Sequence, residues 1–351
     1  MIKNIISSHS SNLGLRGSDM DIFFQLGDNQ ESRDENSNLK AKKWEIKNIT
    51  KQVANILYAD RSERFKSAQP IARANIPIVR VKDRLSGIRC DFNTCTRMGV
   101  VNTSWVKFCA DHHPNIRNLL ILVKIISKRQ GLTGSGRGDH LTSYCLTVLV
   151  IFFLQTKGVL HSVSTLQDVP DLPELQISGY NFSFCRNKIL LPTLHKSETF
   201  SLAQLLQDFF SYMAEFTFGN KAVCPFVGEP VLLYNLRNGN FLHPKLEGCA
   251  TGKSKDRLKT ENAMVVQDPF ELRRNIAANV SPKRLSFVVK TFEAAAKLLE
   301  DGKAQEVGGR KLLAELLNPD LVSRDGEGHK GLWLVTDDDA RAPSANRAAH
   351  S

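Results

Sequence analysis

The chain has 351 residues, of which 42% are hydrophobic and 24% are charged. These fractions are ordinary for a globular protein and exclude a chain that is disordered throughout. Lysine and arginine number 47 against 36 aspartate and glutamate residues, and the net charge of +11 favours a polyanionic partner such as nucleic acid or a nucleotide.

No membrane partner and no export are expected. The longest apolar run, residues 145–154, is about half of the ~20 residues that a membrane-spanning helix needs. The N-terminus lacks the apolar core of a secretory signal. The seven cysteines are odd in number and form no Cys-x-x-Cys pair, which favours free thiols in a reducing, intracellular compartment. Mitochondrion, nucleus and cytoplasm all remain open.

The first third of the chain has the pattern of an α/β domain. Alternating apolar residues predict a strand over 18–26, and a polar insertion follows over 27–43. Helical spacing of apolar residues then predicts a helix over 44–58. Two further strands are expected, over 76–81 and 88–92, joined by a turn at 83–87.

The rest of the chain is predicted to be mainly helical. Helices are expected over 118–129, 142–155, 201–216 and 282–299. Ser201 has the residue type and position of an N-cap. We therefore expect three parts: an α/β domain over 1–110, a helical region over 111–300, and a polar, disordered tail over 301–351.

Three carboxylates are the strongest chemical feature. Asp19 and Asp21 are two residues apart on a predicted strand, so their side chains share one face. Asp91 lies near the end of another predicted strand. Carboxylates at close range repel, and a hard divalent cation such as Mg²⁺ or Mn²⁺ relieves that repulsion. A sheet that brings all three together would form a two-metal centre suited to nucleotidyl transfer; otherwise Asp19 and Asp21 mark a solvated strand end.

The motifs around these residues resemble a known family. Ser8 and Ser18 with the two aspartates, the run 86–91, and residues 266–275 are similar to motifs of the DNA polymerase β-like nucleotidyltransferase superfamily. Further matching residues lie between them in the family's order, so the resemblance covers about residues 6–300. Within the superfamily, the chain resembles the template-independent poly(A) polymerases and terminal uridylyltransferases. The mitochondrial and nuclear speckle branches are the most similar.

The resemblance implies a fold and an activity. It implies an α/β nucleotidyltransferase domain with a small mixed sheet flanked by helices over 1–110. A mainly α-helical, polymerase-associated region that carries a nucleotide-recognition motif would follow over 111–300. The activity would be addition of UMP or AMP, from UTP or ATP, to an RNA 3′ end with Mg²⁺ or Mn²⁺.

The resemblance also implies roles for single residues. Asp19, Asp21 and Asp91 would be catalytic and would bind the metal. The residues implied in nucleotide binding are Ser8, Ser18, Asn102, Thr103, Lys124, Lys128, Ser143, Tyr144, Asp268, Glu271 and Arg274. By this resemblance, Asn102 and Thr103 would contact the ribose, and Lys124, Lys128 and Ser143 would contact the triphosphate. Tyr144 would stack on the base, and Asp268, Glu271 and Arg274 would surround it. Because arginine only donates hydrogen bonds, Arg274 favours UTP slightly.

Other interpretations stay open. Tyr144 could be a core tyrosine, Lys124 and Lys128 a solvated basic face, and Asp268 the cap of a helix-starting turn. Ser7 stands where the family has glycine, and the family's leading helix does not precede it. The alternative function is therefore a catalytically impaired or truncated RNA-binding relic of the same fold, although the three carboxylates favour an enzyme.

Overall fold

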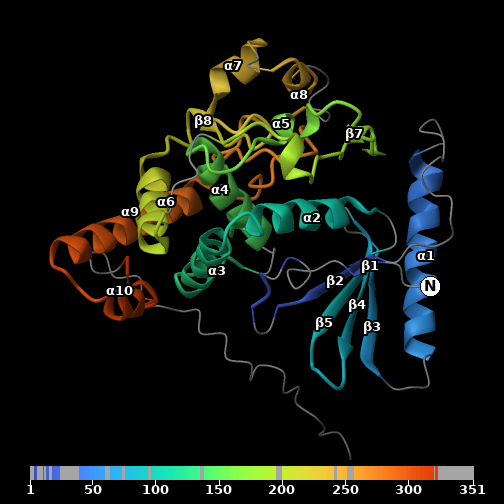
Figure 1. Cartoon of the computed structure of the whole chain (residues 1–351). Coiled ribbons are helices and arrows are strands. Elements are labelled where there is room, and N and C mark those ends of the chain that lie inside the picture. The colour runs from blue at the N-terminus through green and yellow to red at the C-terminus, as the bar shows by residue number, and fades with distance from the viewer. Residues whose placement is uncertain are drawn as a thin grey trace, which may run out of the picture.

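The structure is a computed structural model (Figure 1). It describes residues 4–5, 11, 13–15, 18–23, 39–59, 64–72, 76–93, 96–134, 138–194, 200–240, 243–250, 257–319 and 321–322. A small sheet with one long helix along its outer side forms the first part of the chain. A helical region forms the rest and begins with α2 (Met98–Ala110), which lies beside one end of the sheet in Figure 1.

The sheet is mixed and has the strand order β1-β2-β5-β4-β3. Its strands are β1 (Asn4–Ile5), β2 (Met20–Phe23), β3 (Phe65–Ile71), β4 (Ile78–Asp83) and β5 (Arg89–Asn93). β2 and β5 are parallel, and the other neighbouring pairs are antiparallel. The two strands expected to carry the aspartates are therefore direct neighbours at the centre of the sheet.

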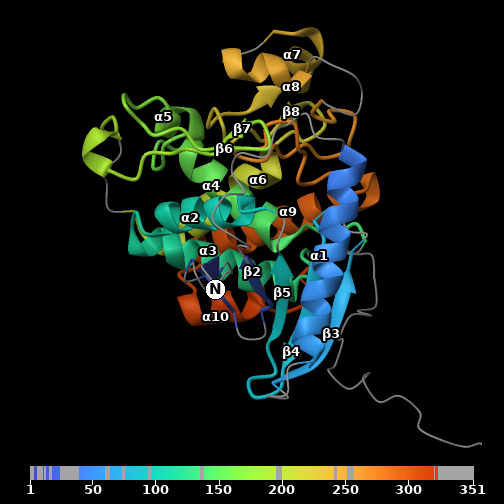
Figure 2. The ribbon, with the colours of Figure 1, turned by 90° about the vertical axis from the view of Figure 1, so that its right-hand side faces the viewer.

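Helix α1 (Leu39–Ala59) covers one face of the sheet, as Figure 2 shows. Alternate strand residues point towards it, and together with Ala54 of the helix they bury a small apolar core: Ile22, Val79, Val81, Cys90 and Phe92. The residues between them point the other way, because side chains alternate along a strand. We call the face turned away from α1 the open face of the sheet.

The helical region contains short helices and two small hairpins besides its long helices. The helices are α3 (Pro114–Arg129), α4 (Ser143–Thr156), α5 (Val163–Gln167), η1 (Lys188–Leu190), α6 (Leu202–Glu215), α7 (Leu233–Asn238), η2 (Pro244–Leu246), α8 (Glu247–Ala250), α9 (Pro282–Ala304) and α10 (Gly309–Leu316). The hairpins pair β6 (Gln176–Ile177) with β7 (Tyr180–Asn181), and β8 (Lys221–Ala222) with β9 (Val231–Leu232).

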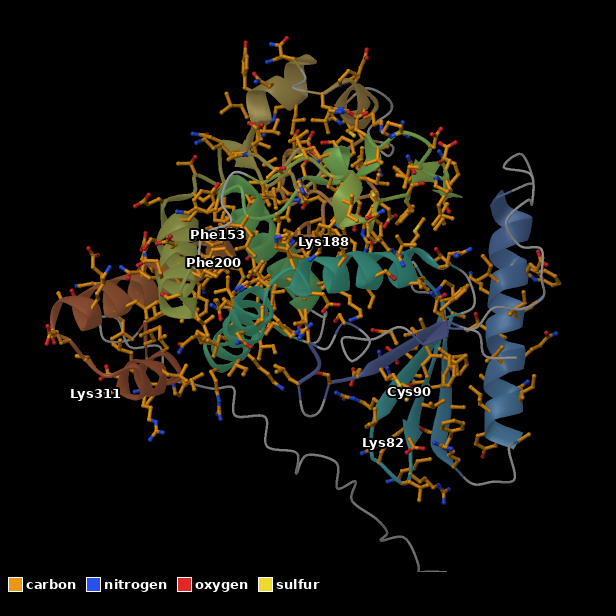
Figure 3. The ribbon with its side chains drawn as sticks, viewed as in Figure 1. Lys82, Cys90, Phe153, Lys188, Phe200 and Lys311 are labelled. Carbon is orange, nitrogen blue, oxygen red and sulfur yellow. The ribbon has the colours of Figure 1, made fainter. Side chains whose placement is uncertain are left out.

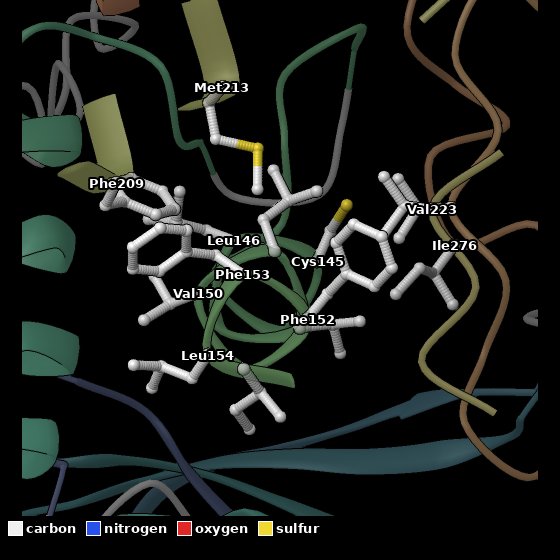
Figure 4. Close-up of a cluster of buried hydrophobic side chains, with 14 of the residues drawn as sticks. Cys145, Leu146, Val150, Phe152, Phe153, Leu154, Phe209, Met213, Val223 and Ile276 are labelled. Atoms are coloured by element: carbon white, nitrogen blue, oxygen red, sulfur yellow. The ribbon is translucent and has the colours of Figure 1, made fainter. Parts of the chain in front are cut away.

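Helix α4 is the centre of the large apolar core. All its residues from Cys145 to Gln155 are buried, which explains why this segment has no polar face in the sequence. Phe152 and Phe153 pack against residues of α6 and neighbouring loops (Figure 4). Thr142 caps the start of the helix: its hydroxyl accepts a 3.0 Å hydrogen bond from the Cys145 N–H. No described helix is both long and apolar enough to cross a membrane.

Most predicted elements are confirmed, with shifts at their ends. The helix expected over 44–58 is α1, and the strands expected over 76–81 and 88–92 are β4 and β5. The predicted N-cap Ser201 accepts a hydrogen bond from the Gln204 N–H. The strand expected over 18–26 is confirmed as β2 over its middle part, Met20–Phe23. Residues 24–26 lie outside the described residues. β3 and α2 were not predicted.

The prediction of a disordered tail from residue 301 is wrong for its first part. Helix α9 continues to Ala304, and α10 follows it. Leu312 packs so closely on Gly302 that a Cβ at this glycine would overlap a Leu312 methyl carbon. Gln130, which follows α3 directly, donates 2.7 Å hydrogen bonds to the carbonyls of Leu316 and Asn318 and so fixes the end of α10. Beyond residue 322 the tail lies outside the described residues.

Candidate active site

The three predicted carboxylates come together on the open face of the sheet. Asp21 of β2 and Asp91 of β5 are direct partners in the parallel register. Asp19 precedes β2 and lies beside Arg89, to which it is hydrogen-bonded. The predicted grouping of Asp19, Asp21 and Asp91 on one face agrees with this register. The grouping depends on parallel pairing of two strands that are about 70 residues apart in the sequence. The alternation of residues within each strand does not predict that pairing.

Two arginines that the sequence analysis did not single out neutralise two of these carboxylates. Arg80, the β4 partner of Asp91 in the register, donates hydrogen bonds from Nε to Oδ1 at 2.8 Å and from Nη2 to Oδ2 at 2.6 Å. Arg89 donates from Nε to Asp19 Oδ1 at 2.8 Å. The first pair is two-pronged with a buried carboxylate, and the second is exposed. The alternation of side chains along β4 and β5 places both arginines on the open face. Which carboxylate each arginine contacts depends on how the strands pair, and the sequence pattern does not predict that pairing.

Asp21 has no such partner among the described residues. Asp21 is exposed as a residue, but neighbouring protein atoms partly desolvate its carboxyl group. Burial, followed by the negative charges of Asp91 and Asp19, raises its pKa to about 6, and Arg80 opposes this shift. Part of the raised pKa therefore comes from the repulsion between Asp21 and the two neighbouring carboxylates.

The donor chemistry fits a divalent cation. Carboxylate oxygens are the ligands that Mg²⁺ prefers, and a cation would relieve the repulsion that raises the pKa of Asp21. As they stand, no three Asp, Glu, His or Cys side chains of the described ranges are arranged to hold one ion. The arginine contacts of Asp91 and Asp19 use oxygens that a cation would need.

The loop before the carboxylates is attached to the helical region. Lys124, buried on α3, donates a 2.8 Å hydrogen bond to the Leu13 carbonyl, and Leu13 itself belongs to the large apolar core. Burial lowers the pKa of the Lys124 ammonium. Ser18 closes the next turn by accepting from the Leu15 N–H at 3.2 Å. Ser8, the first predicted nucleotide-binding residue, lies outside the described residues.

The structure gives the two lysines different surroundings. They were predicted to share a helix face and to meet one triphosphate. Lys124 is buried against the Leu13 carbonyl, whereas Lys128, one turn later on α3, is exposed. Lys124 therefore fastens the loop before Asp19 in this structure. Lys128 is the lysine whose side chain is exposed to a polyanion.

The remaining predicted sugar and phosphate contacts lie on α2 and at the start of α4. Asn102 and Thr103 lie next to each other on α2. The side-chain oxygen of Asn102 is buried and has no hydrogen-bond partner among the described residues, so it can accept from a hydroxyl group that the protein does not supply. Ser143 is exposed at the first position of α4, where backbone N–H groups favour an anion.

The predicted base-recognition motif is a turn. Asp268 is fully buried, and its Oδ1 accepts hydrogen bonds from the N–H groups of Phe270 and Glu271, both at 3.0 Å. No helix starts there, so the alternative of a helix cap is wrong. Tyr144 donates to Asp268 Oδ2 at 3.4 Å. Burial, then the charge of Asp268, raises the pKa of Tyr144 well above its usual value.

Of the three predicted base-contacting residues Asp268, Glu271 and Arg274, only Arg274 is exposed. Glu271 is half-buried and forms a 2.7 Å ion pair with Arg274. The fully buried Asp268 carboxylate serves the turn and Tyr144, and it is covered from any ligand in this structure. Burial raises its pKa. Direct contact with a base is therefore open to Arg274 and, at its side, to Glu271.

Comparisons with known proteins agree with this fold. Residues 4–110 match the family model of the central palm domain of mitochondrial-like poly(A) RNA polymerases. The human mitochondrial poly(A) RNA polymerase is 26% identical over 317 residues, which cover 84% of this chain and 48% of that protein. Human terminal uridylyltransferase 4 is 26% identical over 340 residues, covering 95% of this chain and 18% of that protein. This chain thus spans about half or less of these relatives.

A solved structure shows the same fold. The crystal structure of mtPAP in complex with UTP superimposes with a TM-score of 0.72 at 22% identity, covering 90% of this chain and 64% of that one. The resemblance found in the sequence and the predicted fold class are therefore confirmed. At this identity the likeness concerns the fold alone, and the roles of single residues remain predictions.

Proposed function

Since residues 4–110 match the family model of the central palm domain of mitochondrial-like poly(A) RNA polymerases, we propose that the chain is a template-independent RNA 3′-terminal nucleotidyltransferase. It would transfer UMP or AMP from UTP or ATP to the 3′-hydroxyl of an RNA and release pyrophosphate. One observation carries this proposal: Asp21 and Asp91 face each other in register on parallel strands, with Asp19 on the same face.

The carboxylates would hold Mg²⁺ or Mn²⁺. When bound, such a cation lowers the pKa of an attacking hydroxyl group and neutralises charge on the triphosphate and on the leaving pyrophosphate. Asp91, held by Arg80, would lie nearest the RNA 3′-hydroxyl. The protein's own contribution is to orient the two substrates, because phosphoryl transfer depends mainly on positioning and charge neutralisation.

An RNA substrate is supported by the charges beside the carboxylates. In the sheet register, Lys82 of β4 pairs with Arg89 of β5, and both side chains lie on the open face. Figure 3 marks Lys82 at the lower part of the sheet. Lys82 is exposed and has no acidic partner among the described residues. Two neighbouring basic side chains next to a carboxylate centre, one of them without an acidic partner among the described residues, suit an RNA backbone that reaches it.

The nucleotide would be held by the residues that remain accessible or unsatisfied. The buried Asn102 oxygen would accept from a ribose hydroxyl, which is the group that distinguishes ribonucleotides from deoxyribonucleotides. Ser143 and Lys128 would meet phosphate oxygens, and Tyr144 would stack on the base. Arg274 would donate to a uracil carbonyl or an adenine ring nitrogen, so both bases stay possible, with UTP slightly favoured.

We place this activity inside the cell. The described cysteines are free and buried, as expected in a reducing compartment, and the human relative is named for the mitochondrion.

The test is an extension assay with a labelled RNA oligonucleotide, Mg²⁺ and each ribonucleoside triphosphate separately. We expect extension by the unmodified chain, and loss of at least about 100-fold in rate for Asp21→Asn. Asp301→Asn, which removes one exposed carboxylate at the far end of α9, should keep the full rate. No extension with any triphosphate, with RNA binding retained, would instead support the non-catalytic relic.

A further inference from the structure

Asp19 and its partner Arg89 form the most exposed of the contacts that hold the carboxylates. The side chains of Arg89 and Asp19 are 61% and 40% exposed, and they meet through a single 2.8 Å hydrogen bond. In the pair beside it, Arg80 reaches both oxygens of Asp91, whose side chain is only 11% exposed. One pair is thus easily opened, and the other is not.

Both contacts use carboxylate oxygens that a divalent cation would need. Arg89 is an internal cation at a place where a divalent cation would bind. Exposed ion pairs contribute little to stability, because water screens them and both side chains lose freedom. A divalent cation can therefore replace Arg89 at Asp19 at small cost, while replacing Arg80 would leave Asp91 without its two-pronged partner.

We propose that Arg89 is the exchangeable counterion of Asp19: it occupies this carboxylate until a divalent cation binds, and so sets the affinity of the centre for that cation. Arg80 stays on Asp91 and positions it in both states. Arg89 is thus a positioning residue that acts through Asp19. This inference rests on the proposed function, because it assumes that the carboxylates bind a divalent cation.

The sheet provides a matched control for the effect of charge alone. Lys82 is the partner of Arg89 in the β4–β5 register, so it carries the same charge on the same face, one strand farther from Asp19. It contacts no carboxylate among the described residues. Removing either cation changes the net charge equally, but only Arg89→Gln frees the oxygen of Asp19.

The experiment is a titration of the metal-free protein with Mn²⁺, followed by the electron paramagnetic resonance of free Mn²⁺, without nucleotide or RNA. Arg89→Gln should bind Mn²⁺ roughly three- to tenfold more tightly than the unmodified protein, because a competing contact and a nearby positive charge are lost. For Lys82→Gln, the affinity for Mn²⁺ should rise by no more than about twofold over that of the unmodified protein, because the charge of Lys82 acts over a longer, screened distance. Arg89→Lys, which keeps the charge but not the guanidinium, should lie between them.

Thermal unfolding with and without Mn²⁺ gives a second readout for the same variants. Mn²⁺ should raise the Tm of Arg89→Gln more than that of Lys82→Gln at equal concentration, because the tighter ligand stabilises more. Equal affinities for Arg89→Gln and Lys82→Gln would overturn the proposal and leave the proposed function intact. If Mn²⁺ binds the unmodified chain and Asp21→Asn with the same affinity, the carboxylate centre itself is refuted, and the proposed function fails with it.

Discussion

Asp21 bears a negative charge that the two arginines of the site do not contact directly. Its pKa in the folded protein is about 6, against an ordinary value of 3.8, because of burial and the charges of Asp91 and Asp19. The folded state therefore binds a proton here more readily than the unfolded state. Without a cation, the ionised side chain disfavours the fold, and this cost appears as the pH rises through the window from about 4 to 6.

Asp21→Asn should consequently stabilise the metal-free protein in a pH-dependent way. In EDTA at pH 8 we expect its Tm to be about 1–3 °C above that of the unmodified chain. Near pH 4.5 the difference should shrink, because Asp21 is then largely protonated in the folded protein. Circular dichroism melts at both pH values measure this. A lower Tm for the variant at pH 8 would mean that repulsion does not act at this position.

At the residue scale, the sequence predicts which side chains matter better than it predicts their contacts. The two-residue spacing was enough to put Asp19 and Asp21 on one face. Arg80 was not predicted, because its contact with Asp91 depends on the β4–β5 register. That register is set by long-range strand pairing. Lys124 and Asp268 were assigned to the nucleotide, but their burial against Leu13 and within a turn follows from packing that no local pattern contains.

At the scale of elements, the β4–β5 connection is held by one carboxylate. Asp83 Oδ2 accepts hydrogen bonds from the N–H and hydroxyl of Ser86, at 2.8 and 2.6 Å, and Arg64 pairs with Oδ1 at 3.0 Å. Gly87 closes the turn with a φ of 68°, which favours glycine. The Ser86 contacts, followed by Arg64, lower the pKa of Asp83 to about 2.

Asp83→Ala should therefore destabilise the hairpin that presents Arg80 and Arg89. We expect a Tm about 2–4 °C lower at neutral pH, with Asp83→Asn in between because it keeps one acceptor oxygen. A group with a lowered folded pKa stabilises above its unfolded pKa, so the effect should fade as the pH falls from about 4 to 2. Thermal melts at pH 7 and pH 2.5 would test this. An equal loss at both pH values would argue against an ionic role.

The elements that the sequence missed have weak local patterns. β3 contains Lys66, Gln69 and Pro70 and is an edge strand, the position in a sheet where proline is tolerated. α2 is rich in β-branched residues, which do not favour a helix on their own. Its Trp105 is fully buried, so tertiary packing stabilises it. α4, in contrast, was predicted correctly because its long apolar run has no helix breaker.

At the scale of the whole molecule, the loop that leads to the carboxylates connects the sheet to the helical region. Leu13 is 1% exposed within the large core, and its carbonyl accepts from the Lys124 ammonium at 2.8 Å. A charged hydrogen bond of this kind contributes about 1.5–3 kcal/mol when it is buried. Through this contact, the packing of α3 fixes where the chain enters the turn at Ser18 and then Asp19.

Lys124→Met separates two roles for this lysine. If it fastens the loop, the variant should lower kcat by about 10- to 100-fold, because small displacements of reacting groups are costly, while the KM for the nucleoside triphosphate changes little. If its ammonium instead meets the triphosphate, as the family resemblance implies, KM should rise and kcat should change less. Lys128→Met, one turn along the same helix and exposed, is the control in which only KM should rise. Steady-state extension kinetics of both variants decide between the roles. In the fastening role, the helical region sets the geometry of the carboxylate site through Lys124. A normal kcat for Lys124→Met would refute that role.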